Sequence, residues 1–120
     1  MELKRVVVTG LGALTPVGNN VAETWENLVK GVSGAGPITH FDASKFKTHF
    51  ACEVKNFNGT DYIDRKELRK MDLYTQYAIA AAKEAVEDSG MDLEKEDLNR
   101  IGVIYGVGTV SYTHLTLPTN

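Results

Sequence analysis

Cysteine is almost absent from this chain, and so are several other features that define large classes of proteins. The 120 residues include one cysteine, Cys52, which excludes an internal disulfide. No apolar run approaches the roughly 18 residues that cross a membrane, and the first residues lack the layout of a signal peptide. The formal net charge of −3 argues against general nucleic-acid binding. We therefore expect a cytoplasmic protein that binds neither membranes nor nucleic acids.

Two short apolar runs predict the strands of an α/β fold. Residues 6–9 and 101–105 are rich in valine and isoleucine and show no polar alternation, which is typical of strands buried on both faces of a parallel sheet. A short edge strand is expected over residues 51–55, and residues 31–50 have the glycine and proline content of a loop. Because two core strands cannot complete a sheet, we expect these residues to form part of a larger domain.

Helix signals lie between the two predicted strands. Asn20 is a suitable N-cap for a helix over residues 21–30, and Asp72 for a helix over residues 73–89. A glycine follows each helix at the position that favours a left-handed residue. A shorter helix over residues 65–70 begins with Asp64, which has the spacing of a capping box with Glu67. The order of strand, helix, insertion, helix and strand indicates an α/β fold with a crossover.

Two other patterns have mainly structural interpretations. Gly10-Leu-Gly12 follows a predicted strand, but a dinucleotide-binding fingerprint requires a third glycine where Thr15 stands, so we interpret the segment as a turn in which glycine permits positive φ. Trp25 falls in the apolar stripe of its helix and is expected to anchor that helix to the sheet.

Nucleophilic and metal-binding chemistry finds little support. Cys52 lies beside an acid in a predicted strand, which favours a half-buried structural cysteine over a reactive thiol. His40 and His49 together with Cys52 lack any recognised ligand spacing. We assign no catalytic, cofactor-binding or metal-binding residue, and we expect no cofactor.

One cluster of charges is a candidate binding surface. On a helix, Lys66, Arg69 and Lys70 are three and four residues apart and share one face. Such a patch suits an acidic partner, because lysine and arginine both bind carboxylates and phosphates. A solvated helix face is the alternative interpretation.

The last residues differ in character from the rest. Residues 110–119 match, residue for residue, one reading frame of a transposase adapter used to prepare sequencing libraries. We therefore expect residues 1–108 to be native and residues 109–120 to be a non-native, adapter-encoded tail.

Several segments carry a resemblance to a known family. Lys4-Arg-Val-Val-Val-Thr-Gly-Leu-Gly12, Thr15-Pro-Val-Gly18, Arg65-Lys-Glu-Leu-Arg-Lys-Met-Asp72 and Asp88-Ser-Gly90 stand in the same order as in bacterial β-ketoacyl-acyl-carrier-protein synthases. Residues 1–108 resemble the N-terminal portion of that domain, about the first quarter of its length. The resemblance implies an incomplete thiolase-like fold with layers in the order α/β/α.

The resemblance also implies an activity and a partner. Synthases of this family carry out a decarboxylative Claisen condensation of an acyl-enzyme with malonyl-carrier protein, which gives 3-oxoacyl-carrier protein and CO2. Their nucleophilic cysteine and two histidines belong to motifs that Cys52, His40, His49 and His114 do not match. The residues matching Lys66, Arg69 and Lys70 contact the acyl carrier protein, and the family forms homodimers. A chain-length-factor-like homologue, a polyketide ketosynthase and an inactive carrier-binding remnant are the alternatives.

Overall fold

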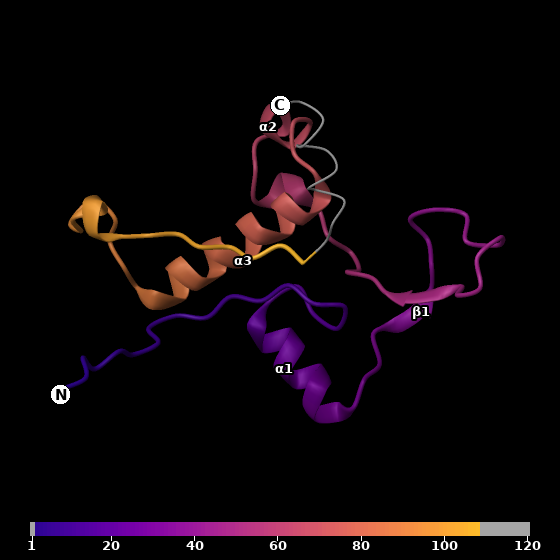
Figure 1. The fold of residues 1–120 in the computed structure, drawn as a ribbon, viewed down its shortest axis with the longest axis horizontal. Coiled ribbons are helices and arrows are strands. Elements are labelled where there is room, and N and C mark those ends of the chain that lie inside the picture. Colours follow the sequence, from indigo (N-terminus) through magenta and orange to yellow (C-terminus); the bar gives the residue numbers. More distant parts are fainter. Residues whose placement is uncertain (1, 109–120) are drawn as a thin grey trace.

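Helices rather than strands dominate the structure, a computed structural model that describes residues 2–108 (Figure 1). The predicted adapter-encoded tail and His114 lie outside these residues. In chain order the elements are α1 (Val21–Lys30), β1 (Ala35–Pro37), β2 (Phe50–Cys52), the 3-10 helix η1 (Gly59–Asp61), α2 (Arg65–Leu68), α3 (Leu73–Ser89) and the 3-10 helix η2 (Leu98–Arg100). No helix within residues 2–108 has the length and apolar character needed to span a membrane.

Helix α1 has the bounds and caps that the sequence predicts. The side chain of Asn20 accepts a hydrogen bond from the Glu23 amide at 2.8 Å, which satisfies one of the free donors of the first turn. Gly31 ends the helix with φ of 72°, a left-handed conformation that glycine adopts without steric cost. Lys30 pairs with Glu26 at 2.7 Å on the exposed face.

Helix α2 begins as predicted but ends at Leu68, two residues before the predicted end, and neither α2 nor α3 has the predicted side-chain cap. Helix α3 has the predicted bounds and ends at Gly90, which has φ of 69°. The carboxylates of Asp64 and Asp72 make no cap hydrogen bond. Instead, their backbone carbonyls accept the first intrahelical bonds, from Leu68 at 3.0 Å and Gln76 at 3.2 Å. The backbone therefore sets where these helices begin.

The strands differ most from the prediction. Strands β1 and β2 form an antiparallel pair in which Ala35 faces Cys52 and Pro37 faces Phe50. Strand β1 lies in the stretch that we predicted as a loop, and β2 is shorter than the predicted strand over residues 51–55.

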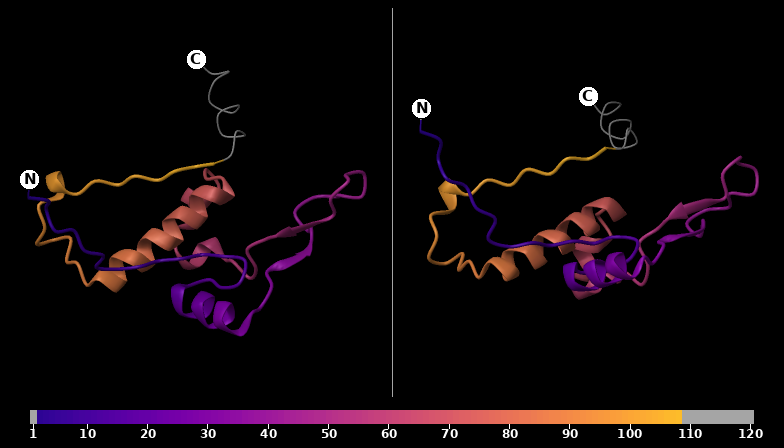
Figure 2. Two further views of the ribbon diagram at one scale, coloured as in Figure 1. Left: turned by 60° about the horizontal axis from the view of Figure 1, so that its bottom comes forward. Right: turned by 90° about the horizontal axis from the view of Figure 1, so that it is seen from below.

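The two predicted core strands are not formed. Residues 6–9 and 101–105 run as extended traces that do not pair with each other (Figure 2). Val6 is 88% exposed and Ile104 is 98% exposed. A strand requires a neighbour for its backbone hydrogen bonds, and neither segment has one within residues 2–108.

The glycine segment packs directly against α3. A Cβ atom on Gly10 would lie 2.6 Å from the Ser89 nitrogen, and one on Gly12 would lie 2.8 Å from the Ala85 nitrogen. Neither glycine has positive φ, so the predicted reason for these glycines is wrong. They are required because a backbone can approach a helix this closely only where neither surface carries a bulky side chain. Ala81 and Ala85 provide such a surface on α3, because each carries only a methyl group where the backbone lies against Gly12.

Two acids of α3 hold this segment in place. The Leu11 amide donates to the Asp88 carboxylate at 2.9 Å, and the Ala13 amide donates to Glu84 at 2.9 Å. Glu84 also accepts from the Val21 amide at 3.0 Å, at the first residue of α1. One carboxylate of α3 therefore joins the glycine segment to the start of α1.

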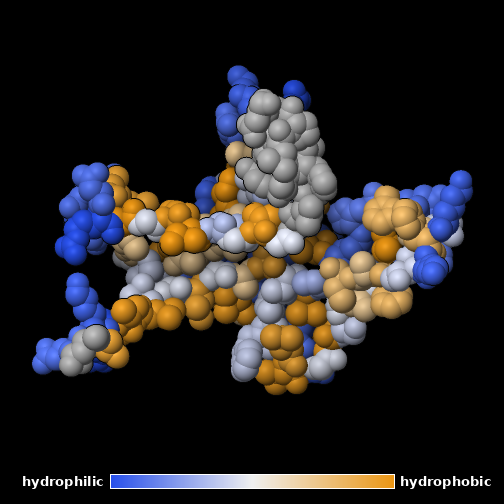
Figure 3. All heavy atoms as spheres, in the orientation of Figure 1, coloured by the Kyte–Doolittle hydropathy of each residue, from blue (hydrophilic) through white to orange (hydrophobic). Residues whose placement is uncertain are grey.

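Few apolar side chains are covered within residues 2–108. Ala43 and Ala80 are the buried apolar residues of this part of the chain. The radius of gyration is 17.7 Å, whereas a compact domain of this size has about 13 Å. Apolar residues gather along the extended segments and α1 on the face that Figure 3 shows. Trp25 is 66% exposed, so its predicted packing on a sheet is wrong: within residues 2–108 the one sheet is the β1–β2 pair, and it does not cover α1.

Candidate functional site

The predicted basic face lies on α2, which η1 and α3 hold in place. Gly59 of η1 is buried, and a Cβ atom there would lie 2.7 Å from the Leu68 side chain and 2.6 Å from that of Gln76. The side-chain amide of Gln76 in turn donates a hydrogen bond to the Met71 carbonyl at 3.3 Å, across the connection between α2 and α3. Leu68 is the half-buried residue of α2, so the opposite face of this short helix is left to solvent.

An aromatic cluster fixes the approach to α2. The ring of Phe57 stacks on Tyr62 with centroids 5.8 Å apart and meets Tyr77 of α3 edge-on at 5.0 Å. Burial raises the pKa of the Tyr77 phenol, and the nearby charge of Glu53 raises it further. The Lys83 ammonium donates to the Tyr62 carbonyl and adds a second link to α3.

The three residues predicted to form a binding surface, Lys66, Arg69 and Lys70, are exposed and lie close together on one helical turn. Lys66 lies within α2, Arg69 follows it in a right-handed helical conformation with φ of −64° and ψ of −20°, and the Lys70 amide bonds the Glu67 carbonyl at 3.0 Å. The turn therefore continues beyond the end of α2, and Lys66, Arg69 and Lys70 remain neighbours. We call these three residues the basic patch. The structure places them together as the sequence predicts.

The other candidates show no site chemistry. Cys52 lies in β2 as expected, but it is exposed rather than half-buried. Within the described part of the chain, no group of three or more His, Cys, Asp or Glu side chains is arranged to hold a metal ion. Gly10 and Gly12 lie against the backbone of α3, so they do not line a binding site.

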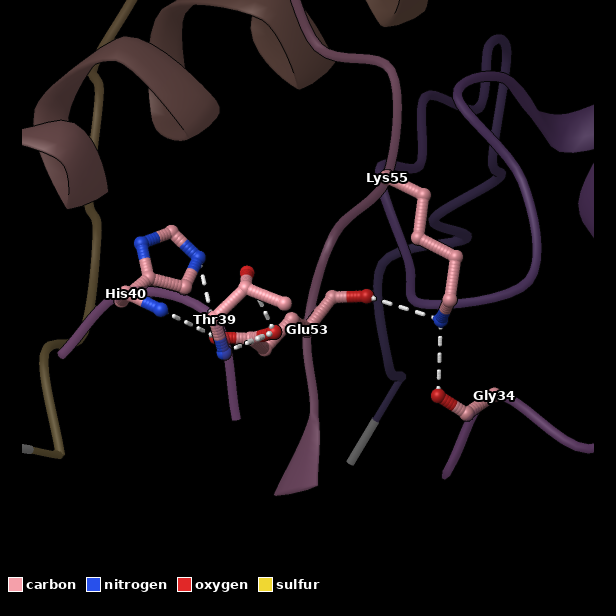
Figure 4. Close-up of polar contacts among 5 residues, drawn as sticks. All are labelled: Gly34, Thr39, His40, Glu53 and Lys55. Carbon is pink, nitrogen blue, oxygen red and sulfur yellow. Dashed lines mark hydrogen bonds and ion pairs between the residues drawn. The ribbon is translucent and has the colours of Figure 1, made fainter. Parts of the chain in front are cut away.

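A polar cluster that the sequence did not reveal lies at the base of the hairpin (Figure 4). The carboxylate of Glu53 accepts from the Thr39 amide at 3.2 Å, the Thr39 hydroxyl at 3.0 Å and the His40 amide at 3.2 Å. His40 Nε2 also lies 3.3 Å from this carboxylate. Desolvation alone would raise the pKa of Glu53, but the hydrogen bonds from Thr39 and His40 outweigh it and hold this pKa below the ordinary value of a glutamate.

Lys55, three residues beyond the end of β2, also belongs to this cluster. Its ammonium donates to the carbonyls of Gly34 at 2.7 Å, Pro16 at 3.1 Å and Glu53 at 3.1 Å (Figure 4). All three acceptors are backbone atoms, so Lys55 fixes the glycine loop to the hairpin rather than facing a partner. The contacts with Pro16 and Gly34 join residues far apart in sequence, and helix or strand periodicity does not signal them.

Comparison with known proteins identifies the family. The chain belongs to the family described as "Beta-ketoacyl synthase, N-terminal domain", which matches residues 3–120. It is similar to the 3-oxoacyl-[acyl-carrier-protein] synthase 2 of Staphylococcus aureus strain COL, with 54% identity over 105 residues, 88% of this chain. Those residues are 25% of the relative, so the chain spans about a quarter of the length of the curated relatives it matches.

Solved structures agree with this assignment. The ishigamide ketosynthase/chain length factor matches with a TM-score of 0.68 and 41% identity over 73% of this chain and 22% of that one. A type II polyketide acyl-carrier protein in complex with its ketosynthase, bound to the hexaketide, matches with a TM-score of 0.60 and 32% identity over 78% of this chain and 24% of that one. These matches support a thiolase-like fold, of which the chain covers the part that aligns with about a quarter of each ketosynthase.

Proposed function

We propose that this chain is the N-terminal part of a condensing enzyme of fatty-acid synthesis. The observation that carries the proposal is the 54% identity with a 3-oxoacyl-[acyl-carrier-protein] synthase 2 over 88% of the chain. The reaction is the transfer of an acyl group from carrier protein to an enzyme thiolate, which releases the carrier thiol. Malonyl-carrier protein then loses CO2, and its carbanion attacks the acyl thioester to give 3-oxoacyl-carrier protein and the free enzyme thiolate.

Within this reaction we assign docking, and no bond-making step, to residues of this chain. Lys66, Arg69 and Lys70 are exposed on one turn and face solvent, as a surface that receives a second protein must. An acidic carrier protein is the partner whose charge complements them, and complementary charge raises the rate of encounter. One neighbouring structure is itself a carrier protein bound to its ketosynthase.

Charge reversal tests this assignment. The host is a synthase of family length that carries residues 2–108 of this chain, either the natural protein or the Staphylococcus aureus relative with this segment exchanged; we call it the full-length synthase. We expect the triple variant Lys66→Glu, Arg69→Glu, Lys70→Glu to slow carrier-dependent formation of 3-oxoacyl product, because the patch would repel an acidic carrier. Added salt should shrink the difference, since exposed charges are screened over about 10 Å at 0.1 M.

A matched variant controls for net charge. Lys4→Glu, Lys45→Glu and Lys47→Glu make the same change in charge at exposed positions outside the basic patch, and turnover should stay near that of the parent enzyme. If the two triple variants behave alike, or if salt has no effect on their difference, the docking role of the basic patch is refuted.

A non-catalytic homologue is the second candidate. The match to a ketosynthase/chain length factor favours it, because a chain-length-factor-like protein shares this part of the fold. The full-length synthase distinguishes the two: an enzyme forms a covalent acyl adduct on a cysteine when given acyl-carrier protein, and a non-catalytic homologue does not.

We extend the proposal to the parts of the protein that residues 2–108 leave open. Residues 6–9 and 101–105 are extended and apolar, which supports their becoming core strands of a layered α/β/α fold once a neighbouring strand is present. Homodimer formation and a cytoplasmic location stay predictions from the family resemblance and from composition. The codon match supports residues 109–120 as adapter-encoded, and long-read resequencing across Thr109 tests it.

A further inference from the structure

An acidic residue stands in the middle of the basic patch. Glu67 is the only acid between Arg65 and Lys70, and four cations with this one anion give the segment a net charge of +3. The Glu67 carboxylate lies 3.8 Å from the Lys70 ammonium. Both side chains are exposed, Lys70 by 73% and Glu67 by 55%, so a partner that reaches one also meets the other.

This pair lies on the surface where a carrier protein would dock. An incoming carboxylate must compete with Glu67 for the Lys70 ammonium, and it also meets the negative charge of Glu67 itself. Like charges a few ångströms apart repel each other even in water, although exposure and salt keep the effect modest. Glu67 therefore repels the same acidic partner that Lys66, Arg69 and Lys70 attract.

We propose that Glu67 limits the affinity of the basic patch for the carrier protein. The inference rests on the proposed function, because it concerns how strongly that surface holds its partner. A condensing cycle needs one carrier to deliver the acyl group and leave before a second delivers the malonyl group. A patch weakened by its own acid still attracts the carrier through Lys66 and Arg69 but binds it less tightly, which suits two successive dockings.

The chain contains a matched pair for control. On α1, Glu26 holds Lys30 at 2.7 Å, with exposures of 64% and 61%, but Lys30 is the only cation of that helix. Glu26→Gln removes the same charge from the same kind of exposed helical ion pair, outside the basic patch. A general effect of net charge would appear in both variants, and an effect of the docking surface would appear only in Glu67→Gln.

The experiment measures carrier-protein binding to the full-length synthase by stopped flow at low salt. We expect Glu67→Gln to raise the association rate and the affinity about two- to threefold, the range of one exposed charge interaction. Glu26→Gln should leave both unchanged. In a Lys70→Gln background the gain from Glu67→Gln should shrink, because the cation that Glu67 engages is absent.

Each outcome separates this inference from the proposed function. If Glu67→Gln binds the carrier no faster than the parent while Lys66→Glu still weakens binding, the role of Glu67 is refuted and the docking surface stands. If neither substitution changes binding, the docking function itself fails. A gain that is equal in Glu67→Gln and Glu26→Gln would reduce the effect to net charge and overturn the inference.

Discussion

Glu84 gives the sharpest test of how this part of the fold is held together. Its carboxylate accepts from the Ala13 amide at 2.9 Å and from the Val21 amide at 3.0 Å. Hydrogen bonds to a charged group contribute about 1.5–3 kcal/mol each, and a partly exposed site lowers that figure because water can replace the lost acceptor. We therefore expect Glu84→Ala to destabilise the full-length synthase by about 2 kcal/mol.

The assay combines denaturant unfolding with hydrogen exchange. Unfolding should show the lower stability, and the amides of Ala13 and Val21 should lose protection before the rest of the chain. Glu87→Ala is the control: it removes an exposed acid from the next turn of α3, and surface substitutions of this kind stay within about 0.5 kcal/mol. Equal stability of the two variants, with both amides still protected, would refute the account of Glu84 as the link between the glycine segment and α1.

Two further predictions follow from packing and from titration. Gly12→Ala should cost about 1–3 kcal/mol of unfolding free energy, because the new methyl group meets the backbone of α3, whereas Gly36→Ala in β1 meets no atom within 4 Å and should be tolerated in the same melting experiment. The pKa of Glu53 is lower in the folded chain than in the unfolded one. Its contribution to the stability of the folded state is therefore complete above the unfolded pKa and is lost as the pH falls through the folded pKa. The protection factor of the Thr39 amide, which compares its exchange rate with that of an unfolded chain at the same pH, should therefore fall as the pH drops below the ordinary pKa of a glutamate, and a protection factor that stays constant across that window would contradict this.

Helices could be predicted from the sequence because their signals are local. Asn20 caps the first turn of α1 and Gly31 ends its last turn, so each signal lies within a few residues of the structure it predicts. The structure confirms both ends of this helix. Strands could not be predicted in the same way, because pairing depends on a second segment. Residues 6–9 and 101–105 have the composition of core strands and form none here, whereas β1, which contains a glycine and a proline, pairs because β2 lies opposite it.

The same distinction divides the candidate site. The basic patch was predictable because helical spacing alone brings Lys66, Arg69 and Lys70 to one turn, and the structure confirms that placement. The contacts of Glu53 and Lys55 were not predictable, because each reaches segments more than ten residues away. The glycine segment was located correctly but for the wrong reason, since a sequence shows the absence of a side chain and not the helix that requires it.

A docking surface and a catalytic centre place different demands on a chain, and the docking role proposed for the basic patch requires less of the surrounding structure. Charge steers a partner over several ångströms and tolerates small displacements, so one short turn such as α2 is enough, provided that its backbone is fixed. Here Leu68 lies against Gly59 of η1, and the Tyr62 carbonyl, just before α2, accepts a hydrogen bond from Lys83 of α3. Bond-making steps need reacting groups held to a fraction of an ångström by a packed surrounding, which residues 2–108 do not build for Cys52. Contacts within residues 2–108 fix individual turns such as α2, but they cover few apolar side chains and build no packed core. We therefore propose a docking role for the basic patch and assign no bond-making step to these residues.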